Sequence, residues 1–378
     1  MDDFHQASTE NMIIPNSNFT TIFLLGFRNI GRFNLLVFTL ILLMYCVTIC
    51  GNLLIITLVS YSKSLHSPMY FFLVQLSVSD IILITDIAPN MLNIVLHEQP
   101  SISFPGCITQ LYFCIVSVTS ECFILMVMSY DRYLAICYPL HYVSIMSQVL
   151  CIIFAFVAWL LSYSVASVLI HGVCSLEFCG PNTIDQLFCD FAPVLKLSCS
   201  DASIVQMKST LLSTAVTVLP FLLIVLSYIY IALTILKISS VSGRLKSFST
   251  CSSHLTVVSI FYGTLISMYV LPNEGKSQII SKILTLMYTV FTPFINPIIY
   301  SLRNKDIKNA LGILQRLSPD MPRCEQSLKP GSRAAPDFGT ELSQSPAQTE
   351  HAKLAKKCLQ SAMTPSAQKH PKVYGLEN

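Results

Sequence analysis

Residues 128–137 read MSYDRYLAIC, and the adjacent charges Asp131 and Arg132 stand between two long uncharged regions. The 32 residues before this pair contain one charged side chain, Glu121, and the 44 residues after it contain none. A helix over 107–131 would rise about 36 Å, which is longer than the roughly 30 Å hydrocarbon core of a bilayer. The stretch therefore predicts a membrane-spanning helix that leaves an ion pair at one membrane face.

The composition of the whole chain points the same way. Hydrophobic residues form 53% of the 378 residues and charged residues 11%, against about 25% charged in ordinary globular domains. Seven charge-poor stretches each reach the roughly 20 residues that a spanning helix needs. They are 33–62, 68–96, 107–130, 148–171, 209–236, 247–273 and 283–302. Because a soluble helical protein needs polar helix faces that these segments lack, the sequence predicts an all-α membrane protein with seven transmembrane helices.

Three signals favour an N-terminus outside the cell and a cytoplasmic C-terminus. The acidic N-terminus shows no cleavable signal peptide, because its first apolar run is long enough to span. Asn18 opens an Asn-Phe-Thr glycosylation sequon, which is usable only outside the cell. Residues 303–378 carry 12 of the 23 Lys and Arg side chains, and the positive-inside rule prefers such a segment in the cytoplasm.

Five of the fourteen cysteines fall on the expected outer side, where disulfides persist. They are Cys107, Cys174, Cys179, Cys189 and Cys199. Four of the five can form two bridges, and spacing alone does not choose the pairing.

Four polar side chains are expected at similar depth inside the bundle. Counted along ideal helices, Asn52, Asp80 and Glu121 lie about 15–18 Å from the inner membrane face, and Asn296 lies about 10 Å from it. Ionisable groups inside a bilayer are costly and usually functional. We therefore expect either a polar hub that binds a sodium ion or shares a proton between Asp80 and Glu121, or structural hydrogen bonding without an ion.

Six motifs occur in order, each on an expected span. They are GN at 51–52, LHSPMYFFL at 65–73, MSYDRYLAIC at 128–137, SY at 227–228, KSFSTCSSH at 246–254 and PFINPIIY at 293–300. With these motifs the chain resembles vertebrate olfactory receptors, a branch of the rhodopsin-like G-protein-coupled receptors. The resemblance implies an odorant receptor in the plasma membrane that activates a stimulatory-type heterotrimeric G protein. It also implies that Cys107 pairs with Cys189 and that Cys179 pairs with Cys199.

The resemblance assigns a G-protein switch to residues at the inner ends of the spans. They are Asp131, Arg132, Tyr133, Tyr228, His254, Asn296, Pro297 and Tyr300. Asp131 can hold the Arg132 guanidinium until a cytoplasmic partner competes for it. Pro297 removes a backbone donor, and a bend at such a proline can have two arrangements. The alternatives are an ordinary helix-end anchor, a static kink and a plain interfacial histidine.

By the same resemblance, a ligand pocket lies between the outer halves of spans 3, 5, 6 and 7. Its candidate contacts are Cys114, Val118, Thr119, Tyr262, Ile266 and Tyr269. The segments 107–120, 209–220 and 262–273 contain no charged side chain, so an unpaired ligand charge would be costly there. We therefore expect a small, neutral, mostly apolar ligand. The alternative is that these side chains only pack helices together.

The expected domain organisation has four parts. Residues 1–32 form an extracellular N-terminus, 33–302 the receptor domain and 303–317 a short amphipathic helix. Residues 318–378 are rich in Ser, Pro, Ala, Gln and Lys, cannot bury a core and are expected to form a disordered cytoplasmic tail. Relatives normally end soon after the short helix, so this tail is either a regulatory segment or an artefact of the gene model.

Other function classes fit the sequence less well. Metal-ligand spacings, phosphate-binding loops and nucleophile motifs are absent from the sequence. We therefore expect no enzyme, no cofactor, no metal beyond the possible sodium ion and no nucleic-acid partner. A transporter is one alternative, although no internal repeat relates the first spans to the last. A non-olfactory chemosensory receptor is another.

Overall fold

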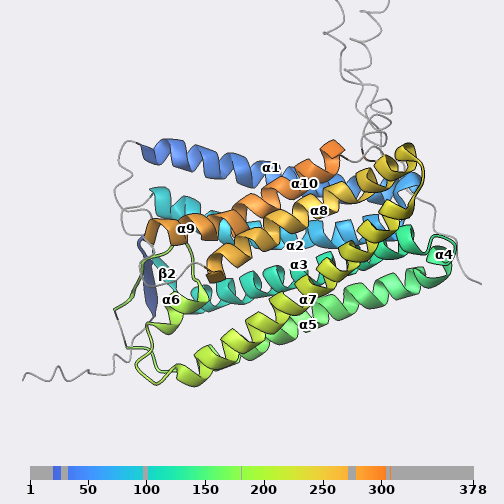
Figure 1. Ribbon diagram of the computed structural model, residues 1–378. Helices are drawn as coiled ribbons and strands as arrows, with labels where there is room; N and C mark the ends of the chain where they lie inside the picture. The colour runs from blue at the N-terminus through green and yellow to red at the C-terminus, as the bar shows by residue number, and fades with distance from the viewer. Residues whose placement is uncertain are drawn as a thin grey trace, which may run out of the picture. The chain divides into compact units, whose positions relative to one another are not determined.

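Seven helical segments lie side by side in one bundle in the computed structural model, which describes residues 20–26, 33–96, 101–179, 181–270, 278–303 and 307 (Figure 1). Six are continuous α-helices: α1 (Asn34–Tyr61), α2 (Pro68–Leu96), α3 (Phe104–Cys137), α5 (Gln148–Cys174), α7 (Ser203–Lys237) and α8 (Val241–Val270). The seventh consists of α9 (Gln278–Leu286), a π-helical segment (Met287–Phe291) and α10 (Thr292–Arg303).

Each predicted charge-poor stretch overlaps one of these segments, and the predicted seven-helix fold class is confirmed. Six of them are long and apolar enough to cross a membrane, and α8 contributes the shorter apolar helix Cys251–Ser267. The short helix predicted over 303–317 lies outside the described residues except for its first residue and Ile307. The tail predicted over 318–378 lies outside them entirely.

Short polar residues set where the helices begin. The Ser103 hydroxyl accepts a hydrogen bond from the Gly106 N–H at 3.2 Å and caps α3, whose first turn contains Pro105. The Ser147 hydroxyl caps α5 in the same way by accepting from Leu150 N–H. Between these two helices lies the short helix α4 (Tyr142–Ile145). The end of the bundle that carries α4 is called the α4 end below.

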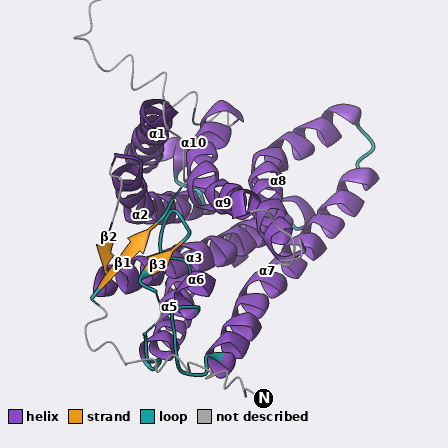
Figure 2. Ribbon diagram, turned by 90° about the vertical axis from the view of Figure 1, so that its left-hand side faces the viewer, coloured by secondary structure: helices purple, strands orange, loops and turns teal. Residues whose placement is uncertain are grey.

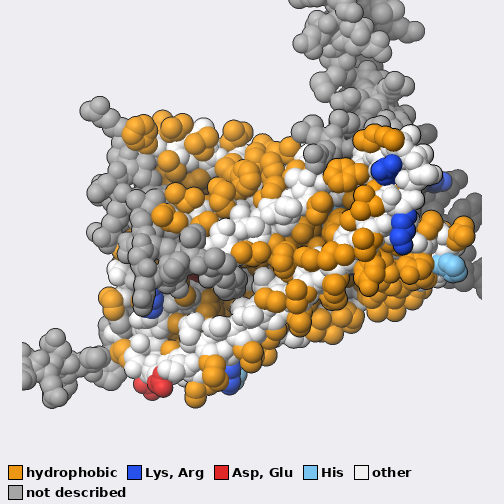
Figure 3. All heavy atoms as spheres, viewed as in Figure 1, with side chains coloured by type: hydrophobic (Ala, Val, Ile, Leu, Met, Phe, Trp, Pro, Cys, Tyr) orange, Lys and Arg blue, Asp and Glu red, His pale blue; other side chains and the backbone are white. Residues whose placement is uncertain are grey.

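Burial differs strongly between the helices and places α3 at the centre. In the most apolar 18-residue stretch of each helix, 67% of the residues of α3 are buried, compared with only 17% of those of α7. Large apolar side chains such as Leu35, Phe156 and Leu219 are exposed on α1, α5 and α7. Figure 3 shows such side chains spread along the long helices. A surface of this kind suits contact with lipid, and α3 is the most buried of the long helices.

A small three-stranded sheet lies at the other end of the bundle, called the sheet end below (Figure 2). Its central strand β1 (Thr21–Leu24) pairs antiparallel with β2 (Ser101–Ser103) and parallel with β3 (Thr183–Ile184). The sequence analysis did not predict this sheet, because strands of two to four residues carry no periodic signal.

Two disulfides hold the long loop between α5 and α7. The structure joins Cys107, at the start of α3, to Cys189, and it joins Cys179 to Cys199. These are the pairs that the family resemblance implied. Cys174 is the remaining cysteine of the five and is an exposed free thiol. The loop is thereby fixed over the sheet end of α3, together with the short helix α6 (Phe191–Leu195).

Candidate functional site

The charged pair at the α4 end is buried and fully engaged. The Arg132 guanidinium donates to one oxygen of Asp131, in part through a 2.9 Å bond from Nε. The Tyr142 hydroxyl of α4 donates to the other Asp131 oxygen at 2.7 Å. Because burial and the neighbouring Asp131 raise the pKa of Tyr142, this hydroxyl keeps its proton and stays a donor. Arg132 is therefore held by its neighbour, and the loop helix α4 takes part in holding it. Sequence analysis missed Tyr142.

A second contact at the same end joins α7 to α8. The Tyr228 hydroxyl lies 2.7 Å from Nδ1 of His254, and the two rings stack at 5.9 Å. His254 is fully buried between the helices. Tyr133 packs instead against other tyrosines, including Tyr230 at 6.0 Å. Tyr300 is fully buried, and its hydroxyl has no hydrogen-bond partner among the described residues.

The proline-rich seventh segment packs directly against α1. Its π-helical turn closes with the Thr292 hydroxyl donating to the Met287 carbonyl at 3.0 Å. Gly51 of α1 lies so close that an added Cβ would be 3.0 Å from the Pro297 ring. The neighbouring Asn52 amide donates to the Pro293 carbonyl at 3.4 Å. The Gly-Asn pair therefore allows and fixes the contact between α1 and the bend, where π-helical turns often mark functional positions.

The four predicted hub residues lie buried in the bundle, but they are not all bonded to one another. The Asn296 amide donates to both oxygens of Asp80, at 3.1 and 3.2 Å. Asn52 bonds to backbone carbonyls of α1 and α10. Both oxygens of Glu121, and the side-chain oxygens of Asn52 and Asn296, have no donor in the described part of the chain. The hub thus contains four buried side-chain oxygens that have no donor among the described residues.

The candidate ligand residues are divided between the bundle interior and its surface. Cys114 and Thr119 are buried on α3, and Cys114 belongs to the same buried apolar cluster as Phe188 of the disulfide-held loop. Val118 is half-buried between the same cluster and the main core.

On α8, Tyr262 is buried against Phe221 of α7, with ring centroids 4.9 Å apart. Ile266 is 41% exposed and lines a groove of about 510 Å³ between α7 and α8, so the structure does not bring it to the α3 residues. The Tyr269 side chain lies outside the described residues.

At the sheet end, an ammonium group ties three chain segments together. Nζ of Lys282, in α9, donates to the Gly26 carbonyl after β1 and to Asp185 of the long loop, both at 2.6 Å. The Lys282 side chain is 6% exposed and that of Asp185 27%. Sequence analysis missed this pair. The signal that could have found it is Lys282 itself, a lone basic residue immediately before the charge-poor stretch 283–302.

Gln110 of α3 holds the long loop from below. Its side-chain amide donates to the Asp86 carbonyl of α2 at 2.8 Å and accepts from the Cys189 N–H at 3.0 Å. The next residue, Asp190, caps α6 by accepting from the Phe191 N–H at 2.7 Å. Burial raises the pKa of Asp190, and the bond from Phe191 opposes this shift. The loop is therefore anchored to α2 and α3 by polar bonds as well as by a disulfide.

Comparison with known proteins gives consistent results. The family model described as olfactory receptor matches residues 41–316. Olfactory receptor 1468 of Rattus norvegicus is 46% identical over 274 residues, which cover 72% of this chain and 87% of the relative. Olfactory receptor 11L1 of Homo sapiens is 45% identical over 300 residues, 79% of this chain and 93% of the relative. The crystal structure of squid rhodopsin has the same fold, with a TM-score of 0.61 at 19% identity over 75% of this chain and 86% of that chain.

Proposed function

Since the chain belongs to the olfactory receptor family of G-protein-coupled receptors, we propose that it binds a small, neutral, mostly apolar odorant and activates a stimulatory-type G protein. It is a multi-pass membrane protein that acts as an odorant receptor through G proteins, and it is not an enzyme. The class of ligand, the type of G protein and the residues that serve each are what we propose. The observation that carries the proposed G-protein coupling is the Asp131–Arg132 pair, which Tyr142 holds at the end of the central helix.

The proposed switch works by competition for the Arg132 guanidinium. A buried charge pair is strongly destabilised when one partner is removed, so Arg132 stays on Asp131 until another acceptor replaces it. An acceptor on the G protein is proposed to do so while the Tyr228–His254 contact rearranges between α7 and α8.

Arg132→Ala should abolish odorant-evoked cyclic AMP in a reporter cell line while the epitope-tagged protein still reaches the cell surface. A variant that reaches the surface and signals normally would refute the switch.

The proposed ligand site lies between Cys114 and Thr119 of α3 and Tyr262 of α8, below the disulfide-held loop. It includes Val118 and Tyr269 as further proposed contacts, and it leaves out Ile266, which lies in the groove between α7 and α8. Since an unpaired charge is costly in such surroundings, alcohols, aldehydes, ketones, esters and terpenoids are the proposed ligands.

Thr119→Val should shift the dose–response curve of an activating odorant, whereas Thr109→Val, the same change at an exposed position of α3, should leave it in place. Activation by permanently charged amines alone would contradict the ligand class.

The proposed role of the polar hub is to hold a sodium ion or a shared proton. Buried acceptor oxygens without donors on Glu121, Asn52 and Asn296, beside the Asp80 carboxylate, suit a hard cation that prefers oxygen ligands. Asp80→Asn should change the sodium dependence of basal signalling, and Glu177→Gln, the removal of an exposed acid, should not. Identical sodium curves for Asp80→Asn and the wild-type protein would leave only structural hydrogen bonding.

The proposed location is the plasma membrane, with the sheet end outside the cell and the α4 end in the cytoplasm. Support comes from the two disulfides at the sheet end, because disulfides persist in oxidising compartments. Asn18, the proposed glycosylation site, lies outside the described residues, as does most of the N-terminal segment 1–32. Asn18→Gln should remove a glycosidase-sensitive shift in electrophoretic mobility, and an unshifted wild-type protein would count against glycosylation at this site.

A further inference from the structure

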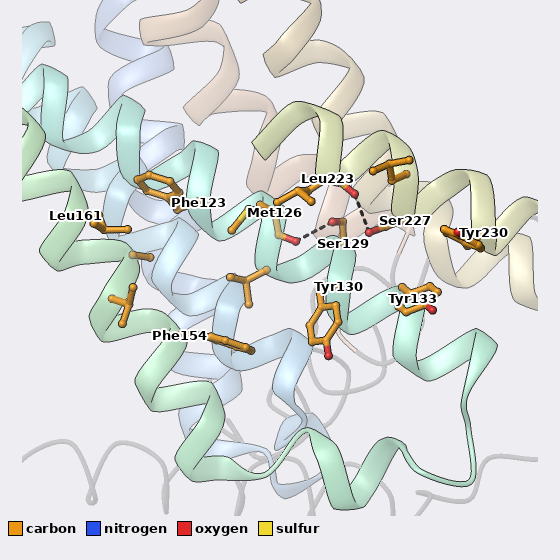
Figure 4. A pocket seen from close by; sticks show the side chains of 14 residues that line it. Phe123, Met126, Ser129, Tyr130, Tyr133, Phe154, Leu161, Leu223, Ser227 and Tyr230 are labelled. Atoms are coloured by element: carbon orange, nitrogen blue, oxygen red, sulfur yellow. Dashed lines mark hydrogen bonds between the residues drawn. The ribbon is translucent and has the colours of Figure 1, made fainter. Parts of the chain in front are cut away.

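A groove of about 550 Å³ runs between α3, α5 and α7 in the half of the bundle nearer the α4 end (Figure 4). Its walls are apolar and aromatic, and they include Phe123, Tyr130, Phe154 and Leu226. No Lys, Arg, Asp or Glu is among the described residues that line it. The volume and lining are those of small-molecule sites in proteins, which are mostly apolar and fall at about 300–1,000 Å³.

The groove opens on the outside of the bundle. Val157 is 41% exposed, Leu161 43% and Leu226 50%, and all three line it. It is therefore separate from the proposed odorant site, whose α3 residues lie nearer the sheet end and do not line the groove. In a membrane-spanning bundle this surface faces lipid, so a component of the bilayer is the molecule that can enter it.

Polar atoms are placed unevenly along the groove. The Ser129 and Ser227 hydroxyls, drawn with dashed bonds in Figure 4, donate to carbonyls of their own helices at 2.7 and 2.8 Å. These two side chains therefore need nothing from an occupant. The phenol groups of Tyr130, Tyr133 and Tyr230 lie toward the α4 end of the groove, with Tyr133 6.0 Å from Tyr230 and 6.3 Å from Tyr130 between ring centroids. Charge complementarity thus favours a neutral occupant whose single polar group lies at that end.

The walls also favour a rigid occupant over a flexible one. Tyr130 stands edge-on to Phe154 at 6.2 Å and is tilted against Tyr133 at 6.3 Å, so three stiff rings shape one side. A flexible acyl chain would lose conformational freedom on being ordered there, whereas a fused ring system is already ordered. We propose that the groove binds a membrane sterol, with its ring system between α3, α5 and α7 and its hydroxyl near Tyr133 and Tyr230.

Such a sterol would bridge the helices that carry the proposed switch. Tyr133 follows Arg132 directly, and Ser227 and Tyr230 flank Tyr228. A molecule that contacts α3 and α7 together binds most tightly when the two helices keep the distance that they have in this structure. Any ligand that prefers one arrangement raises the population of that arrangement. The sterol site would thereby stabilise the arrangement of α3 and α7 described here, whatever odorant the receptor binds.

Photolabelling of the full-length protein tests the proposal. The purified protein is placed in phosphatidylcholine nanodiscs with a photoreactive cholesterol analogue, and labelled peptides are mapped by mass spectrometry. Labels should concentrate on the groove residues of α3, α5 and α7. Excess cholesterol should remove them, and excess diacylglycerol, a flexible neutral amphiphile with one hydroxyl, should not.

Two tryptophan variants give a matched comparison on α7. Leu226 lines the groove and Leu222 does not, and both side chains are 50% exposed. Leu226→Trp should fill the groove and reduce labelling about tenfold, and Leu222→Trp should leave it unchanged. Val157→Phe provides a second groove-filling variant, and melting temperatures without sterol show that each variant is folded.

Four results would overturn the proposal. One is labelling spread evenly over the exposed helices, and a second is labelling that is unchanged in both groove-filling variants. A third is equal competition by diacylglycerol, which would indicate an acyl chain. The fourth is protection of the groove residues in a cross-linked dimer without sterol, which would indicate a second copy of the chain.

Discussion

Two glycines inside helices should respond to the same substitution with opposite signs. An added Cβ at Gly51 of α1 would lie 3.0 and 3.1 Å from two carbons of the Pro297 ring, whereas one at Gly263 of α8 meets no atom within 4 Å. Alanine in place of a helical glycine ordinarily raises the free energy of unfolding by about 0.5–1 kcal/mol. Gly263→Ala should therefore stabilise the protein by that amount.

For Gly51→Ala, the gain is outweighed by overpacking. Carbon atoms pack best at about 3.5–4.0 Å, so the new methyl group would be about 0.5–1 Å too close to a stiff ring. Overpacking of this kind costs about 1–3 kcal/mol, because α1 and α10 must separate. The expected net result is a loss of about 1–2 kcal/mol for Gly51→Ala.

Melting of the purified protein, followed with a thiol-reactive dye, measures both variants. Buried thiols such as those of Cys122 and Cys151 react only after unfolding. The apparent melting temperature should fall by several degrees for Gly51→Ala and rise by a few degrees for Gly263→Ala. A Gly51→Ala protein that melts at or above the wild-type temperature would refute the close contact with Pro297.

Three further substitutions test other contacts. Lys282→Met leaves the Gly26 carbonyl without its donor and should lower the melting temperature by the equivalent of about 1–3 kcal/mol. Lys208→Met, a change at an exposed lysine, should leave the melting temperature unchanged, and equal melting of the two variants would disprove the contact. Cys189→Ser breaks a disulfide worth about 2–5 kcal/mol and should be retained inside the cell, so normal surface labelling would count against its importance. Tyr142→Phe removes one bond to the Asp131–Arg132 pair and should raise ligand-free cyclic AMP, and an unchanged basal level would show that this bond does not restrain signalling.

Sequence alone predicted the helices well because a helix that spans a bilayer needs about 20 consecutive, mostly apolar residues. The boundaries of α2, at 68 and 96, agree with the charge-poor stretch predicted there. The π-helical turn at Met287–Phe291 was not predicted, since its residues are as apolar as those of any spanning helix. The strands were missed because their pairing depends on loops that are distant in sequence.

The candidate sites were predicted in part, for a related reason. Counting residues along a helix gives the depth of a side chain but not the direction in which it points. Depth placed Asp80 near Asn296, and the structure bonds them. It also placed Asn52 there, but depth did not predict that the Asn52 amide donates to the backbone carbonyl of Pro293. Tyr142 and Lys282 act through partners in other segments, so their roles follow only from tertiary structure.

The position of β1 at the centre of its sheet has a consequence for biosynthesis. The ribosome makes β1 first, but Thr183, which pairs with Phe23, follows 160 residues later. At the usual rate of about 5–20 residues per second, β1 waits about 10–30 s for that partner. During this time Ile22 and Leu24, later buried, are on a strand that has at least one open edge, because β2 can cover only the other edge. An open strand edge is a template for aggregation, so chaperones that shield this strand during synthesis should raise the yield of folded receptor.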